Sequence, residues 1–200
     1  KRLEPLPETA EELARVSVAI GGRQEDLFLG EKASETVMKR TDFSRYRIIS
    51  FATHGLMAGD LSGLVEPALV LTPPPQPTPQ DDGLLTTSEI SRLQLDAELV
   101  ILSACNTAAA DGTPQAEGLS GLTRAFFAAG SRGVIASHWP VISESTVLLM
   151  TRAAAHKSSG AQISWAMALK AAMVELLDKE GRAEFAHPVH WAPFVAVGAG

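Results

Sequence analysis

Residues Arg45-Tyr46-Arg47-Ile48-Ile49-Ser50-Phe51-Ala52-Thr53-His54-Gly55 hold a β-branched and aromatic run that stops at a histidine and a glycine. A run of this kind, bounded by polar residues, predicts a buried strand. Glu98-Leu99-Val100-Ile101-Leu102-Ser103-Ala104 has the same character and leads directly into Cys105. The sequence therefore predicts two buried strands, one ending at His54 and the other at Cys105.

Strands and helices are expected to alternate along the rest of the chain. Two more strands are predicted over Gly133–Trp139 and Ala192–Val197. Apolar residues at helical spacing predict four helices, over Glu8–Ile20, Leu119–Ala129, Ser145–His156 and Gln162–Asp178. Alternating strands and helices indicate βαβ units, so we expect an α/β fold whose mostly parallel central sheet has helices on both faces.

Three segments carry weaker signals. Asp26–Leu29 is a candidate short strand, and Ala68–Leu71 is apolar enough for another. Thr72–Gly83 contains five prolines within seven residues, which cannot join a sheet ladder. We expect this segment to be an extended surface loop, which is either a tolerated insertion or a proline-recognition ligand.

Composition excludes several classes of protein. The 200 residues are 46% hydrophobic and 20% charged, with a mean hydropathy of +0.09, so the chain can bury a core and is not disordered. A net charge of −6 without a local basic stripe argues against nucleic acid or an anionic membrane as a partner. No apolar run approaches the roughly 20 residues that span a bilayer.

The single cysteine, Cys105, cannot form an internal disulfide. We therefore expect a reducing compartment, the cytoplasm. The first residues, Lys1-Arg2-Leu3-Glu4-Pro5, include neither an initiator methionine nor a signal peptide. We expect residues 1–200 to be one domain of a longer chain.

His54 and Cys105 together indicate nucleophilic chemistry. A cysteine attacks as the thiolate and needs a nearby base, which a histidine supplies near neutral pH. If the two strands pair in parallel, both residues lie at the same edge of the sheet, and their spacing of 51 residues matches a caspase pattern. The backbone amides of Gly55 and Cys105 are then placed to hold an oxyanion. The alternative is an inert buried cysteine and an ordinary loop histidine.

Other kinds of site lack their sequence motifs. There is no Walker loop, no Gly-x-Ser-x-Gly elbow and no Gly-x-Gly-x-x-Gly. The remaining histidines are not accompanied by cysteines or carboxylates at ligand spacing, and the acids form no calcium loop. We therefore expect neither a metal nor an organic cofactor.

An ordered set of motifs resembles the CHAT domain, a caspase-like domain that is often attached to tetratricopeptide repeats. The motifs, which span roughly residues 5–198, are Phe51-Ala52-Thr53-His54-Gly55, Asp82-Gly83-Leu84-Leu85-Thr86-Thr87-Ser88-Glu89-Ile90, Leu102-Ser103-Ala104-Cys105-Asn106-Thr107, Glu117-Gly118-Leu119-Ser120-Gly121-Leu122, Ala136-Ser137-His138-Trp139-Pro140-Val141 and His187-Pro188-Val189-His190-Trp191-Ala192-Pro193-Phe194.

The resemblance implies a caspase/separase-like three-layer αβα fold and the dyad of clan CD cysteine peptidases. His54 is then the general base and Cys105 the nucleophile of an endopeptidase that acts on peptides or proteins. Absent domains, such as tetratricopeptide repeats, or a regulatory partner would control it. Two alternatives stay open: a catalytically silent interaction module on the same fold, and an acyltransferase that uses the same dyad.

Substrate selection depends on the segment Trp139-Pro140-Val141-Ile142-Ser143-Glu144. The family and its separase relatives usually carry one or two acids here, and in separases such an acid binds a basic P1 side chain. This sequence has Ile142 and Ser143 where acids are common, and only Glu144 remains. Ser143 and Glu144 are the candidate substrate-binding residues, and Glu144 has a second reading as the cap of the following helix.

Overall fold

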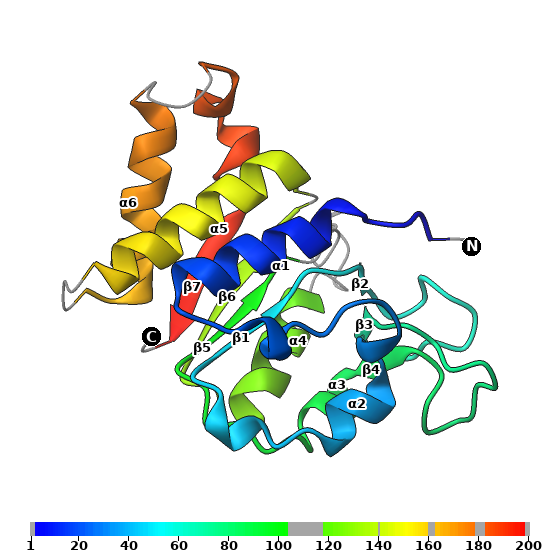
Figure 1. The fold of residues 1–200 in the computed structure, drawn as a ribbon. Helices are drawn as coiled ribbons and strands as arrows, with labels where there is room; N and C mark the ends of the chain where they lie inside the picture. Colours follow the sequence, from blue (N-terminus) through cyan, green and yellow to red (C-terminus); the bar gives the residue numbers. More distant parts are fainter. Residues whose placement is uncertain (1–2, 104–117, 140, 160–162, 179–182, 199–200) are drawn as a thin grey trace.

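A four-stranded sheet forms the centre of the molecule (Figure 1). The computed structural model describes residues 3–103, 118–139, 141–159, 163–178 and 183–198. The strands lie in the spatial order β1 (Ile48–Phe51), β5 (Leu99–Leu102), β6 (Gly133–Ser137) and β7 (Phe194–Gly198). β1, β5 and β6 are parallel, and β7 pairs antiparallel with β6. The expected mostly parallel sheet is confirmed.

Helices cover both faces of this sheet (Figure 1). One face packs against α1 (Glu8–Ala19), α5 (Ser143–Ser158) and α6 (Trp165–Leu177). The other packs against α2 (Glu35–Arg40), α3 (Thr87–Ile90) and α4 (Gly118–Ala128). The structure is thus a three-layer αβα arrangement, consistent with the expected caspase-like fold.

Burial of β5 on both faces explains this layering. Leu99 and Ile101 pack into the cluster that includes α1, α5 and α6, whereas Val100 and Leu102 pack into the opposite cluster. Successive side chains of a strand point to opposite faces, so a continuous apolar run fills two cores at once. Each such side chain contributes roughly 1.5–3 kcal/mol by burial.

A second, smaller sheet follows His54. It consists of the antiparallel strands β2 (Gly55–Leu56), β3 (Ala68–Val70) and β4 (Leu84–Thr86). The strand expected over Ala68–Leu71 is confirmed. The strand expected over Asp26–Leu29 is not, because Gln24–Asp26 forms a 3-10 turn and the residues after it have no strand partner in the described part of the chain.

Helix starts follow side-chain caps. Thr86 and Glu89 form a reciprocal capping box at the start of α3. The hydroxyl of Ser164 accepts a hydrogen bond from the amide of Met167, so α6 begins at Trp165. The remaining short 3-10 turns span Gly30–Lys32, Phe43–Arg45, Ala183–Ala186 and Pro188–His190.

The proline-rich loop is anchored at its far end by α2. The buried carboxylate of Glu35 accepts hydrogen bonds from the amides of Asp82 (2.7 Å) and Gly83 (2.5 Å). Lys39 pairs with that carboxylate at 2.7 Å and donates to the carbonyl of Gln80 at 2.5 Å. The loop therefore returns to the sheet along a fixed path.

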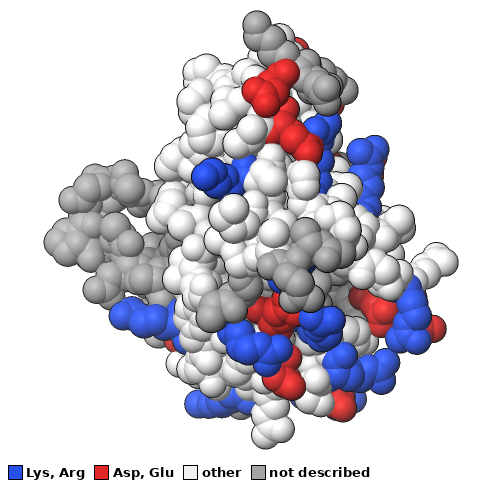
Figure 2. Space-filling model, turned by 90° about the vertical axis from the view of Figure 1, so that its left-hand side faces the viewer, with Lys and Arg blue, Asp and Glu red and all other residues white. Residues whose placement is uncertain are grey.

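The surface carries both signs of charge. On the face shown in Figure 2, acidic and basic side chains are interspersed. Opposite charges also pair directly: the carboxylate of Glu98 accepts from both Arg47 and Lys157. Among the described residues of this face there is no extended basic stripe.

Gly130 provides a test of the packing behind α4. Its φ is +110°, and a Cβ there would lie 2.1 Å from the carbonyl oxygen of Leu95. We expect Gly130→Ala to lower the free energy of unfolding by about 2–4 kcal/mol, because it adds a backbone clash to an unfavourable φ. Gly21→Ala is the matched control, since φ is +75° but nothing lies within 4 Å of the added atom. Urea unfolding of both variants checks this, and equal losses would contradict it.

Candidate active site

The pairing of β1 with β5 aligns the ends of the two strands. Phe51 lies opposite Leu102, and the amide of Ser103 donates to the carbonyl of Phe51 at 2.9 Å. His54 follows Phe51 by three residues, and Cys105 follows Leu102 by three. Cys105 itself lies outside the described residues. The two candidate residues thus follow paired positions by the same number of residues.

His54 is partly exposed at this carboxyl edge. Its Nε2 lies 2.7 Å from the carbonyl oxygen of Glu4. A carbonyl only accepts hydrogen bonds, so in this contact Nε2 carries the proton. In the neutral ring the lone pair is then on Nδ1, and Nδ1 is the nitrogen that can accept a proton.

The backbone around His54 is fixed by β3. The amide of Val70 donates to the carbonyl of His54 at 2.8 Å, and the hydroxyl of Thr53 donates to the carbonyl of Val70. Gly55, the expected oxyanion residue, is buried in β2 opposite Leu69. The small sheet therefore holds the His-Gly pair at the end of β1.

Ser143 and Glu144 lie in the first turn of α5. They line a cleft of about 660 Å³, together with Ile142 and Val147 from the same region and Glu8, Glu11 and Arg15 from α1. Glu144 is exposed, and its place in the first turn is where the helix dipole favours an acid. The N-cap position of α5 is Ile142, so Glu144 is not the cap residue itself. Its role as a substrate-binding carboxylate stays a prediction.

The acids of α1 are members of this cleft that the sequence did not reveal. Glu11 pairs with Arg15 at 2.6 Å, and Glu8 lies one turn earlier. Glu4, which contacts His54, is four residues before Glu8, so their Cα atoms are at most about 14 Å apart. A short stretch of chain therefore connects the backbone that contacts His54 with an acid of the cleft. A signal was present in the sequence, since Glu8 and Glu11 are acids of a predicted first helical turn.

Glu12 is a second residue that the sequence did not single out. It is buried beneath α1, and burial raises the pKa of its carboxyl to about 7, an effect that the hydroxyl of Ser103 partly opposes. Oε1 has no hydrogen-bond partner among the described residues. Glu12 precedes Val16 by four residues and so shares its core-facing side of the helix, which is the signal that could have identified it.

Three further histidines have ordinary partners. His156 pairs with Glu175 at 2.6 Å, and Nδ1 of His190 lies 3.0 Å from the hydroxyl of Ser145. Nδ1 of His187 accepts from the amide of Val189 at 3.3 Å.

Within the described ranges, no three His, Cys, Asp or Glu side chains gather in a way that could hold a metal ion. None of the described helices is long and apolar enough to cross a bilayer.

Comparison with known proteins assigns the family. A family model described as the CHAT domain matches residues 1–199. The chain belongs to the CHAT domain family. Tetratricopeptide repeat protein 28 of Mus musculus is 28% identical across 98% of this chain, and that of Homo sapiens is 31% identical across 60% of it. This CHAT domain corresponds to 9% and 5% of these two relatives, so it spans a small part of their length.

Glu12 should make stability depend on pH. Its pKa is about 7 in the fold and near 4.5 in an unfolded chain, so the folded state binds more protons between these values. The free energy of unfolding should therefore fall by about 3 kcal/mol as pH rises through this window. Glu12→Gln stays neutral and should lack this loss, whereas the exposed neighbour variant Glu11→Gln should keep it. Urea unfolding at pH 5 and pH 8 measures the difference, and parallel pH profiles for wild type and Glu12→Gln would refute the assignment.

Proposed function

We propose that this CHAT domain is a cysteine endopeptidase in which His54 is the general base and Cys105 the nucleophile. The observation that carries the proposal is the β1–β5 register, since both residues follow the paired positions Phe51 and Leu102 by three residues. Side chains at the carboxyl ends of neighbouring parallel strands lie within reach of one another. The family membership supports the same dyad.

The proposed reaction uses atoms of the protein, the peptide and water. Sγ of Cys105 attacks the scissile carbonyl carbon while His54 accepts the thiol proton. The backbone amides of Gly55 and Cys105 hold the oxyanion. The C–N bond then breaks, His54 returns the proton to the leaving amine, and a thioester remains. Water hydrolyses the thioester with His54 again as base, which releases a carboxylic acid and restores the thiol.

The proposed substrate is a peptide or protein with a basic P1 residue. Ser143 and Glu144 would bind it in the cleft that also contains Glu8 and Glu11. Three carboxylates against one arginine give this cleft a negative balance, which supports a lysine or arginine over an acidic side chain.

The domain is proposed to function within a longer polypeptide. The relatives are named for tetratricopeptide repeats, and residues 1–200 would be one CHAT domain whose activity such repeats or a regulatory partner controls. A cytoplasmic location would keep the thiol of Cys105 reduced.

One observation favours the alternative of a silent interaction module. The contact between Glu4 and Nε2 of His54 places the chain that leads into α1 directly against the proposed base. If that chain also keeps a substrate away from Nδ1 of His54, the domain would bind a partner without chemistry, or would act only after the chain moves. Thiol reactivity separates these cases from an active enzyme.

Cys105 should react faster with a peptide chloromethyl ketone than a free cysteine does. His54→Ala should slow this reaction by about 100-fold or more, because the base that generates the thiolate is lost. His156→Ala is the control and should leave the rate unchanged, because His156 lies in the last turn of α5 and pairs with Glu175. Mass spectrometry of the labelled protein measures the rates. If wild type reacts no faster than free cysteine and His54→Ala changes nothing, the enzyme proposal is wrong.

A fluorogenic peptide library varied at P1 tests the substrate class. We expect cleavage after arginine and lysine, with kcat/KM reduced at least tenfold by Glu144→Ala, because a carboxylate that pairs with the basic side chain is removed. Glu31→Ala removes an exposed acid away from the cleft and should have no effect. A preference for small or apolar P1 residues, unchanged in Glu144→Ala, would exclude the basic specificity. Transfer of the acyl group to an added amine in place of water would indicate an acyltransferase.

A further inference from the structure

Glu12 is a buried acid that the proposed reaction does not use. Its side chain is 3% exposed, and Oε1 has no hydrogen-bond partner within the described part of the chain. Removing a carboxyl from water without a partner for each oxygen is costly, so a group of this kind calls for a physical reason. The place of Glu12 in the fold supplies one.

The direction of α1 puts Glu12 toward the carboxyl edge of the sheet. The helix starts at that edge, since Glu4 contacts His54 just before it. It ends at the amino edge, where the carbonyl of Ala19 accepts from Ser158 and the lysine next to this serine pairs with Glu98, just before β5. α1 therefore runs antiparallel to β5, and its first turns lie nearest the candidate dyad.

The packed faces of α1 and β5 bring Glu12 to Ser103. Val16 packs in one cluster with Leu99 and Ile101, and side chains two positions apart on an extended chain share a face, so Ser103 continues the row. Glu12 lies one helical turn before Val16, toward the carboxyl edge. The hydroxyl of Ser103 does act on the carboxyl of Glu12, whose charged form it stabilises.

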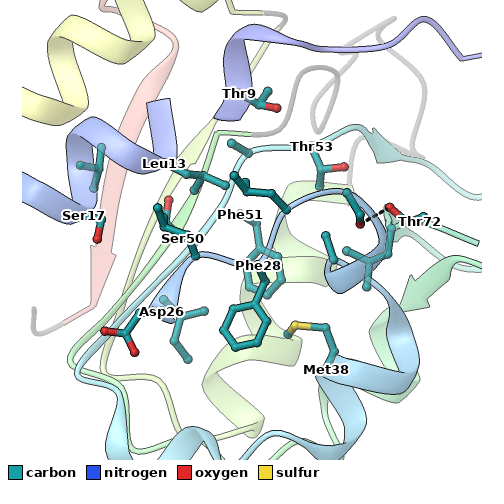
Figure 3. A pocket seen from close by; sticks show the side chains of 18 of the residues that line it. Thr9, Leu13, Ser17, Asp26, Phe28, Met38, Ser50, Phe51, Thr53 and Thr72 are labelled. Carbon is teal, nitrogen blue, oxygen red and sulfur yellow. Dashed lines mark hydrogen bonds between the residues drawn. The ribbon is translucent and has the colours of Figure 1, made fainter. Parts of the chain in front are cut away.

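A different side of α1 borders the largest cavity around the helix. This cavity, of about 680 Å³, lies between α1 and β1, and Figure 3 shows Thr9, Leu13 and Ser17 of α1 around it. Glu12 is not one of its lining residues. The carboxyl of Glu12 is therefore held against the packed side of the sheet, next to Ser103.

Ser103 joins Glu12 to both members of the candidate dyad. Its amide donates to the carbonyl of Phe51 at 2.9 Å, and Phe51 precedes His54 by three residues. Ser103 also precedes Cys105 by two residues. Its side chain is buried, and its Oγ has no partner of full hydrogen-bond geometry among the described residues. A displacement of Ser103 would therefore reach the backbone that leads to each reactive side chain.

The other titratable or charged groups near Glu12 lie at the surface or at strand ends. α1 itself contributes Glu8, Glu11 and Arg15, which are all exposed. Within the described ranges, β5 contributes none, the first two turns of α5 contribute Glu144, and the segments after β1, β6 and α6 contribute His54, His138 and His190. Burial is the largest influence on the pKa of Glu12, which it raises to about 7, and Ser103 is the next.

We propose that Glu12 is a positioning residue, whose neutral carboxyl packs on Ser103 and holds the end of β5 where Cys105 and His54 can meet. This role rests on the proposed function, since it concerns the same dyad. An ionised carboxylate at this place would need water, so it would draw α1 and Ser103 apart. The dyad would then be assembled at acidic pH and would loosen as pH rises through about 7.

Alkylation of Cys105 by iodoacetamide at pH 6 tests the positioning role without any peptide hydrolysis. Cys105 is the single cysteine, so the rate reports on one thiol. Glu12→Leu should slow alkylation about fivefold or more, because an apolar side chain cannot hold the hydroxyl of Ser103 and the thiolate loses its partner. Glu12→Gln keeps a neutral polar group of the same shape and should stay within about twofold of wild type.

Two further variants separate positioning from ordinary packing. Ser103→Ala should slow alkylation as Glu12→Leu does, and the double variant should be no slower than either single one, because both remove one contact. Val16→Ala is the matched control. It truncates the buried neighbour of Glu12 on the same helix face, so it should lower the free energy of unfolding but leave the alkylation rate unchanged.

The pH profile tests the protonation state that the role requires. Inactivation by a peptide chloromethyl ketone is measured for wild type and Glu12→Gln between pH 5.5 and pH 8, while near-ultraviolet circular dichroism confirms that both stay folded. The ratio of the wild-type rate to the Glu12→Gln rate should be close to one at pH 5.5. It should fall about fivefold by pH 8, where a carboxyl of pKa about 7 is mostly charged.

The outcomes distinguish this role from the proposed function itself. If His54→Ala slows alkylation but Glu12→Leu stays within about twofold of wild type, the dyad stands and the role of Glu12 is wrong. If neither variant changes the rate, both proposals are wrong. Equal slowing by Val16→Ala would reduce Glu12 to a packing residue. A rate ratio that rises with pH would show that the charge of Glu12 assists the dyad, which also overturns the inference.

Discussion

Backbone hydrogen bonds between β1 and β5 set the positions of both the core and the candidate site. The pairing of the two strands is fixed at both ends: the amide of Glu98 donates to the carbonyl of Arg47 at 2.7 Å, and the amide of Ser103 donates to the carbonyl of Phe51 at 2.9 Å. A slip of one residue would turn every β1 side chain to the opposite face. Phe51 would then leave the cluster that contains Val100 and Leu102, and His54 would shift relative to the end of β5. The same hydrogen bonds thus specify both the packing and the relative position of the candidate dyad.

The strands were predictable where their apolar residues are continuous. β5 and β6 are buried on both faces, so the sequence alone marks them without reference to their neighbours. Residues 27–29 have strand-like backbone angles but no strand partner among the described residues, and pairing of this kind cannot be derived from local sequence. The antiparallel direction of β7 could not be predicted from its own sequence either, since it depends on where the chain returns to the sheet after α6.

The candidate site was predictable only in part. His54 and Cys105 could be identified because each comes shortly after an apolar run that predicts a strand, whereas Glu12 looks like any acid of an amphipathic helix until its burial is known. The cleft at Ser143 brings together α1 and α5, whose first residues are more than 130 positions apart in the chain. A sequence pattern shows which residues share an element, but the approach of two helices is a property of the packed core.

The direction of β7 places the two ends of the described chain at opposite edges of the sheet. Because β7 runs antiparallel to β6, with Gly198 opposite Gly133, it leaves the sheet at the amino ends of the parallel strands. The chain that enters α1 approaches at the other side of the molecule, where Glu4 meets His54. A segment attached ahead of Leu3 would therefore be tethered beside His54, and one attached after Gly198 would be held at the opposite edge of the sheet. Mechanical force or a binding event would reach His54 directly from the first attachment, and from the second only through the sheet.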